Sequence, residues 1–205
     1  MKKLFILGIC LLLTSCFEIT EKIKHNSNQS GDYSLVIDFS NSWLKTKSAI
    51  LLEEVDGVSI PNEEDIKSKL AQFRADASKI KGTSKISTSY DFNTYVFKIN
   101  FSYNSIETLN AVLNTIDKKN SLVHFKNNNG RFERIASYPL PKDLAKKEDK
   151  KEDLLKANIT AVYTFDKDVA TVQNPNSKLS KSKKTVFLKQ NIWNVLNNNK
   201  LMNNS

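Results

Sequence analysis

Strict alternation of apolar and polar residues is the feature that most limits the folds open to this chain. The segment YVFKINFSY, residues 95–103, places an aromatic or isoleucine side chain at every odd position, and YSLVIDF, residues 33–39, repeats the pattern. A two-residue period sends alternate side chains to opposite faces of a strand. One apolar face with one largely polar face is typical of an antiparallel sheet covered on one side.

Turn residues and further strand-like runs extend this pattern. Because Asn and Gly tolerate positive φ, we expect hairpin turns at NSNQSG, DFNT and NNNG. Further strands are expected at residues 17–25, 159–166 and 184–189.

Apolar stripes with helical spacing indicate the helices. Asn62 and Ser105 can cap helices whose stripes run over residues 66–80 and 106–116. A weaker helix is expected from about residue 42 to 54, and a short one at residues 190–196. Strand pairs interrupted by helices predict an α+β fold, an antiparallel sheet of hairpins with helices packed mainly on one face.

The first sixteen residues have the layout of a secretion leader that ends in a cysteine. Two lysines precede an apolar run at residues 4–13, which is shorter than the roughly 20 residues of a membrane-spanning helix. The sequence LTSC at residues 13–16 resembles the bacterial lipobox. That resemblance implies cleavage between Ser15 and Cys16, diacylglyceryl transfer to the Cys16 thiol and acylation of the new amino group, usually by a palmitate-like chain. The alternatives are a plain signal peptide with a chance cysteine, or the first helix of a globular protein.

A lipid on Cys16 would determine how the protein is attached to the membrane. Each buried CH₂ contributes about 0.8 kcal/mol, and two or more chains anchor a protein stably. A basic residue near an anionic surface adds only about 1 kcal/mol. Strand-like sequence begins directly after Cys16, so the domain is expected close to the membrane. The residues that follow, Phe17 to Ile19, lack the Asp that retains enteric lipoproteins in the inner membrane, which favours the outer membrane facing the periplasm.

These features predict the domain organisation. Residues 1–15 form the signal peptide, and residues 16–196 form a single α+β domain anchored through Cys16. Within it, LPKDLAKKEDKKEDLLK carries charge around most of its circumference, with Leu144 and Leu155 as sparse apolar contacts. We expect a solvated helix or connector at about residues 141–157, with a binding element as the alternative. Residues 197–205 are expected to be a disordered Asn-rich tail.

Cysteine and charge exclude several classes of protein. Cys10 would leave with the leader and lipid would occupy Cys16, so neither a disulfide framework nor a CxxC site is possible. Without Lys2 and Lys3, 29 basic residues face 22 acidic ones. The last acidic residue is Asp168, so the excess charge lies near the C-terminus.

The basic segment KLSKSKKTVFLK is the candidate anionic-surface contact. Its residues Lys178, Lys181, Lys183 and Lys184 could meet anionic lipid headgroups or lipopolysaccharide. The alternative is a lysine-rich hairpin edge that blocks strand pairing. It lacks the interleaved aromatic residues of a single-strand nucleic-acid binder, and no nucleic-acid partner is expected.

The sequence predicts no catalytic, cofactor-binding or metal-ligating residues. His25 is expected to be solvated at a strand edge and His124 to be half-buried on a strand. No G-x-S-x-G elbow and no phosphate-binding glycine motif occurs.

Beyond the lipobox, the layout resembles small bacterial lipoproteins of the LppM-like class. The resemblance rests on a strand directly after Cys16, the turn-containing segment NQSGDYSLVIDFS, helices with further hairpins, and the late SKSKKTVFLK element. It implies an envelope lipoprotein and carries no catalytic residues. The sequence therefore predicts a non-enzymatic, lipid-anchored binding domain with an envelope protein or an anionic lipid as partner. The alternatives are an envelope hydrolase assembled from scattered Ser, His and carboxylate residues, and a purely structural envelope component.

Overall fold

The computed structural model of the chain describes residues 17–204, except for residues 53, 56–57, 118–121, 139 and 141–144. The predicted cleavage site at Ser15, the predicted lipidation site at Cys16, and Leu144 lie outside the described residues. Among those residues, no helix is long and apolar enough to cross a membrane.

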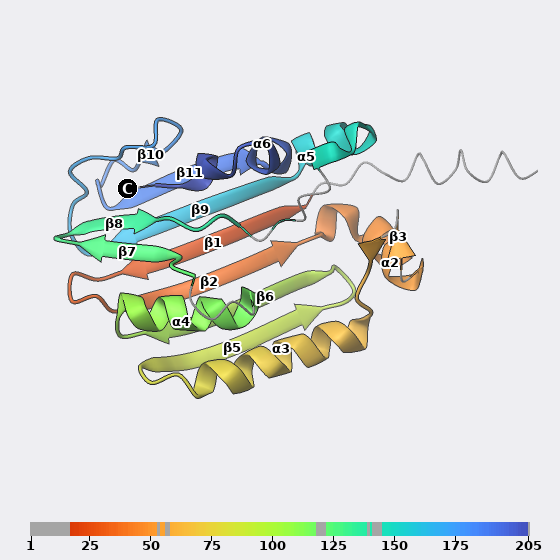
Figure 1. Ribbon diagram of the computed structural model, residues 1–205, viewed down its shortest axis with the longest axis horizontal. Helices are drawn as coiled ribbons and strands as arrows, with labels where there is room; N and C mark the ends of the chain where they lie inside the picture. The colour runs from red at the N-terminus through yellow and green to blue at the C-terminus, as the bar shows by residue number, and fades with distance from the viewer. Residues whose placement is uncertain are drawn as a thin grey trace, which may run out of the picture.

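A seven-stranded sheet forms the centre of the molecule (Figure 1). Its strand order is β10-β11-β9-β1-β2-β6-β5. All neighbouring strands are antiparallel except β1 and β9, which pair in parallel. The strands are β1 (Glu18–His25), β2 (Gly31–Asp38), β5 (Thr83–Asp91), β6 (Val96–Tyr103), β9 (Asn158–Phe165), β10 (Lys178–Leu179) and β11 (Thr185–Asn191).

Helices and a small hairpin cover one face of this sheet. The helices are α2 (Trp43–Leu52), α3 (Glu63–Ser78), α4 (Ile106–Asp117), α5 (Lys151–Lys156) and α6 (Ile192–Asn197). Short 3₁₀ turns are η1 (Ser40–Ser42), η3 (Glu148–Lys150) and η4 (Asn199–Met202), and two hairpins are β3 (Glu54–Val55) with β4 (Val58–Ser59) and β7 (Phe125–Asn128) with β8 (Arg131–Arg134). Helices α3 to α6 and the β7–β8 hairpin contribute to one core, whereas α2 lies at the end of the sheet where β1 begins (Figure 1). The predicted α+β class is confirmed, with the parallel β1–β9 pair as an addition.

Local hydrogen bonds explain where the two longest helices begin. The Asn62 side chain accepts from the Asp65 N–H while Asp65 bonds back to the Asn62 N–H, a capping box that satisfies free donors at the start of α3. Ser105 Oγ accepts from the Thr108 N–H at 3.2 Å and begins α4. Both capping predictions are confirmed.

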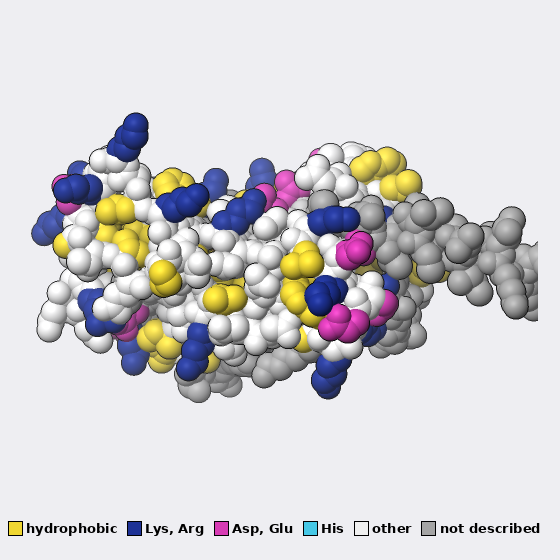
Figure 2. Space-filling view, turned by 90° about the horizontal axis from the view of Figure 1, so that it is seen from above, with side chains coloured by type: hydrophobic (Ala, Val, Ile, Leu, Met, Phe, Trp, Pro, Cys, Tyr) yellow, Lys and Arg dark blue, Asp and Glu magenta, His cyan; other side chains and the backbone are white. Residues whose placement is uncertain are grey.

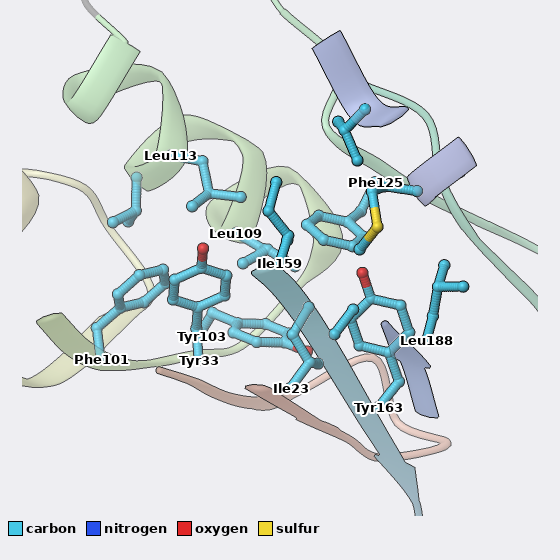
Figure 3. Packing of buried hydrophobic residues seen from close by; sticks show 14 of the residues in the cluster. Ile23, Tyr33, Phe101, Tyr103, Leu109, Leu113, Phe125, Ile159, Tyr163 and Leu188 are labelled. Atoms are coloured by element: carbon cyan, nitrogen blue, oxygen red, sulfur yellow. The ribbon is translucent and has the colours of Figure 1, made fainter. Parts of the chain in front are cut away.

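The core lies between the sheet and the elements that cover it (Figure 3). Tyr33 of β2 and Phe101 of β6 stack with ring centroids 5.0 Å apart. Leu109 of α4 and Ile159 of β9 are fully buried above them. The odd-numbered residues of β1 and β6 face this core, as the alternation in the sequence predicts.

The C-terminal segment differs from its prediction. Residues 197–204 form the end of α6, the turn η4 and a short bridge, so a disordered tail is the wrong description for them. Met202 is fully buried, and the Arg134 N–H donates to the Asn204 carbonyl at 2.8 Å. The Asn198 side chain accepts from the Lys200 N–H and starts the turn. Asparagines that suggested fraying therefore serve as turn residues that place Met202 in the core.

The charged segment before β9 also differs in detail. Leu154 of α5 is buried, whereas Leu155, which was expected to make the apolar contact, is 42% exposed. Successive helical residues point about 100° apart, so only one of these leucines can face the sheet. The expectation for Leu155 is therefore wrong.

Candidate binding face

The even-numbered residues of β1 and β2 form a sheet face opposite the core. Lys22 and Lys24 of β1 lie across from Ser34 and Asp32 of β2 in the strand register. The same face continues with polar residues on β6 and with Thr160 and Thr164 on β9. Helices α3 to α6 pack on the other side, so this face, called here the open face, is a broad and mostly polar surface that also carries Val36 and Val162.

A shallow hollow of about 320 Å³ lies on the open face. Its polar lining comes from strands β1, β2, β5 and β6: Lys22, Lys24, Asp32, Ser34, Lys85, Asn100 and Ser102. Ser102 Oγ donates to Asp32 Oδ1 at 2.5 Å, which holds that carboxylate against β6. The residues around the hollow therefore include three lysines, one carboxylate and neutral hydrogen-bonding side chains, together with Tyr33 and Phe101.

An irregularity in β5 brings the third lysine to the hollow. The β5–β6 register shifts between Ser84 and Ser87, and Lys85 within this bulge has a φ of +50°. Bulges interrupt the strand alternation and redirect side chains, and non-glycine residues adopt positive φ only occasionally. Lys85 at this bulge lines the same hollow as Lys22 and Lys24 of β1, although β2 and β6 lie between the two strands.

Beneath the open face, a polar cluster is buried in the core. The Glu21 carboxylate accepts from Tyr163 Oη at 2.7 Å, from Arg134 Nε at 3.2 Å and from Tyr33 Oη at 3.2 Å. Arg134 also donates to the Ala136 carbonyl, and its guanidinium lies 3.8 Å from the ring centroid of Tyr138. The Glu21 carboxylate thus accepts three hydrogen bonds, and Arg134 donates to both Glu21 and a carbonyl, which is how buried charges are tolerated.

Burial and charge shift the titration of this cluster. Burial raises the pKa of Tyr33 and Tyr163, and the neighbouring Glu21 carboxylate raises it further. Burial alone would lower the pKa of Arg134, but Glu21 raises it above its ordinary value. The tyrosines thus stay neutral and Arg134 stays charged. With Glu21 and Arg134 each less than 5% exposed, the cluster holds the fold rather than meeting a substrate.

Both histidines are more buried than their sequence positions predicted. His25 is only 3% exposed, because the odd-numbered face of β1 is the core face. Its Nδ1 lies 3.0 Å from Tyr103 Oη and its Nε2 lies 2.9 Å from the Asn127 amide. Burial lowers the pKa of His25, with Asp166 partly opposing the shift. The expectation of a solvated His25 is wrong.

His124 is 5% exposed and precedes β7 rather than lying on a strand. Its Nε2 lies 3.2 Å from Asn114 Oδ1, and its N–H donates to Asn110 Oδ1 at 2.9 Å. The expectation of a half-buried strand residue is therefore also wrong. In the described part of the chain, no group of three or more His, Cys, Asp or Glu residues could hold a metal ion.

The lysine-rich segment forms the edge hairpin of the sheet. Lys178 lies in β10 at the sheet edge, while Lys181, Lys183 and Lys184 lie in the turn before β11 and are exposed. Lys and Arg side chains project from this end of the molecule (Figure 2). The register β11–β9–β1 places the turn beside the end of β1, whereas Phe17 lies at its start. With about 3.3 Å per strand residue, the two ends of the eight-residue β1 are roughly 25 Å apart.

A larger hollow of about 480 Å³ lies between β8 and the C-terminal segment. Its amide side chains hold the chain end: Asn174 donates to the carbonyls of Leu201 and Asn203. These contacts hold the C-terminal segment in place. They therefore explain the amide side chains that line this hollow without a ligand.

Part of this site was visible in the sequence. Lys22 and Lys24 were not among the predicted contact residues, but their alternation with Ile23 is the signal that they lie on the solvent face. Glu21 and His25 follow Ile19 at two-residue intervals, so the same alternation was the signal that they face the core. The position of Lys85 depends on the bulge, which no local sequence pattern indicates.

Comparisons with known proteins give one distant neighbour of the fold. No protein-family model matches the sequence. No curated protein matches it either. Among solved structures, the fold is similar to the NMR structure of the folded domain of LppM from Mycobacterium tuberculosis, with a TM-score of 0.45 and 11% identity, covering 88% of this chain and 85% of that chain. The likeness is one of overall layout, and it assigns neither a lipid anchor nor a ligand to this chain.

Proposed function

We propose that this protein is a non-enzymatic bacterial envelope lipoprotein, anchored through Cys16, whose open face binds an anionic ligand. The observation that carries the binding role is the convergence of Lys22, Lys24 and Lys85 on one hollow, with Asp32 as the acidic group in its lining. The lipobox at residues 13–16 carries the anchor, and the residues after it favour the outer membrane facing the periplasm.

The lining of the hollow favours a phosphate-bearing ligand. Lysine ammonium groups are compact point charges that attract phosphate, and serine and asparagine side chains add neutral donors. A hollow of about 320 Å³ is near the lower end of small-molecule sites, which suits a single phosphorylated group.

The position of the hollow indicates where this ligand comes from. Lys22 and Lys24, which both line the hollow, lie four and six residues along β1 from Glu18, or roughly 13 and 20 Å from the proposed anchor end. Headgroups of the anchoring membrane therefore lie too far away along the strand. The ligand is accordingly a phosphate-bearing molecule outside that membrane, such as a phosphorylated envelope polymer. The exposed lysines of the β10–β11 turn lie at the same end and would add to its attraction.

The histidine positions support binding over hydrolysis. His25 and His124 are buried in separate places, and neither lines the two hollows described above. A general base must reach the proton that it removes, directly or through one water. The hydrolase alternative thus has no histidine at either hollow.

Titration with polyphosphate of the chain from residue 16 tests the binding role. The Cys16→Ser variant keeps this chain free of lipid. We expect Lys22→Glu/Lys24→Glu/Lys85→Glu to weaken binding at least about tenfold, since each lysine near an anionic surface contributes about 1 kcal/mol. The matched control, Lys69→Glu/Lys79→Glu/Lys81→Glu, changes the charge equally at exposed positions in and just after α3 and should bind nearly as well as the parent.

Two results would contradict the assignment. One is an equal loss in both triple variants, which would mean that only net charge matters. The other is that the open-face variant still binds polyphosphate while a variant of Lys178, Lys181, Lys183 and Lys184 does not. That result would place the binding site at the edge hairpin.

A further inference from the structure

Helix α2 exposes an unusual amount of apolar surface for its length. Trp43, Leu44, Leu51 and Leu52 are 47%, 51%, 75% and 64% exposed. They are four of the nine large apolar side chains that are exposed in the described part of the chain. None of the ten residues of α2 is buried, so the helix does not use an apolar face to join the core.

The exposed residues share one side of the helix. With 100° per residue, Trp43, Leu44, Leu51 and Leu52 fall within one half of its circumference. Lys47, which is also exposed, lies between Trp43 and Leu51 on that side. A tryptophan, several leucines and a lysine whose charged end can reach upward to water are the residues that membrane-surface helices present to a bilayer.

The helix begins where the N-terminal segment enters the fold. The rings of Phe17 and Phe39 stack with centroids 5.1 Å apart, and Glu18 pairs with Asp38 in the β1–β2 register. Phe39 directly precedes η1 and α2, while Phe17 directly follows Cys16. Because Cys16 is one residue before Phe17, an acyl chain on it would be attached close to the start of this helix.

We infer that α2 is a membrane-contact helix that lies in the interface of the anchoring bilayer with Trp43, Leu44, Leu51 and Leu52 inserted. This inference rests on the proposed anchor at Cys16. The occupant is the bilayer rather than a protein, because Phe17, which directly follows the proposed lipid-bearing Cys16 in the sequence, stacks on Phe39 just before the helix. In this orientation the sheet extends away from the membrane. The lysines of the β10–β11 turn then lie at its distal end.

Tryptophan fluorescence on vesicles tests this inference. In the chain that starts at Cys16, that residue is the single thiol, and coupling it to a maleimide-bearing lipid reproduces the anchor whether or not cells lipidate it. Trp193→Phe leaves Trp43 as the single tryptophan. On vesicles of phosphatidylethanolamine and phosphatidylglycerol with brominated acyl chains, Trp43 emission should shift to the blue and be quenched.

Two variants locate the effect on α2. Leu51→Asp/Leu52→Asp should abolish the shift and the quenching, whereas Leu179→Asp, at another exposed leucine on the distal edge strand, should leave both unchanged. The result for the parent chain is sufficient to overturn the inference. It would do so if the coupled chain stays on the vesicles while its Trp43 emission is neither shifted nor quenched. A dimer in solution that Leu51→Asp/Leu52→Asp converts to monomer would also overturn it, because a second copy would then cover the helix. Failure of the anchor itself is detected separately, as unmodified Cys16 in protein from cells.

Discussion

Among single residues, Glu21 and Arg134 form a buried ion pair between distant parts of the chain. Both are buried, and they join β1 to the end of β8 across 113 positions of sequence. Removing one partner of a buried ion pair leaves the other charge unpaired, which typically costs about 3–5 kcal/mol. We therefore predict that Glu21→Gln and Arg134→Met each lower the free energy of unfolding by about that amount in urea denaturation.

The double variant of this pair provides the control. Because Glu21→Gln/Arg134→Met removes both charges, its loss should be clearly smaller than the sum of the single losses. Additive effects would show that the two side chains do not stabilise the protein as a pair.

His25 should make stability depend on pH near neutrality. Burial lowers its pKa in the folded protein, so the unfolded chain takes up a proton first as the pH falls below about 6.5. Its stabilising contribution is complete above that pH and is lost as the pH falls through the folded-state pKa. Urea denaturation at pH 7.5 and 5.5 should show lower stability at the lower pH. His25→Gln should flatten this change, and an unchanged slope in the variant would rule out His25 as its source.

At the scale of elements, the C-terminal segment acts as part of the core. Met202 is fully buried, and truncating a buried methionine to alanine typically costs about 2–5 kcal/mol. We predict a loss of this size for Met202→Ala, measured by chemical denaturation. The neighbouring Leu201→Ala, at a half-buried position, should lose clearly less. If Met202→Ala were nearly as stable as the parent, the C-terminal segment would be a frayed tail rather than part of the core.

The same elements show what the sequence alone could predict. Local alternation predicts the strands that contain Tyr33 and Phe101. Local hydrogen bonds account for the helix caps at Asn62 and Ser105. The parallel pairing of β1 with β9 depends on contacts between residues about 140 positions apart. The composition of the C-terminal segment led to a wrong prediction. Its many asparagines suggested disorder, whereas Met202 within it is buried in the core.

The candidate site was less predictable than the fold, for a related reason. Lys22 and Lys24 follow from strand alternation, but the hollow needs β1, β2, β6 and the β5 bulge side by side. Lys85 reaches the hollow only through a left-handed backbone conformation at that bulge. Tertiary contacts that no local pattern encodes thus decide which lysines converge.

At the scale of the whole molecule, the two ends of the sheet differ in chemistry. The end at which Phe17 lies carries the exposed apolar side chains of α2, and the opposite end carries the lysines of the β10–β11 turn. The open face connects them, with its hollow nearer the basic end. A domain anchored at the apolar end would therefore hold its basic surface away from the membrane, toward ligands in the surrounding compartment.

Mass spectrometry of the N-terminal peptide, from protein purified out of native membranes, tests the central claim most directly. The account predicts a peptide that begins at Cys16 and carries a diacylglyceryl group and an N-linked acyl chain. It also predicts that Cys16→Ala protein is no longer held in the membrane through lipid. A peptide that begins elsewhere with Cys16 unmodified would contradict the lipid anchor and the orientation built on it.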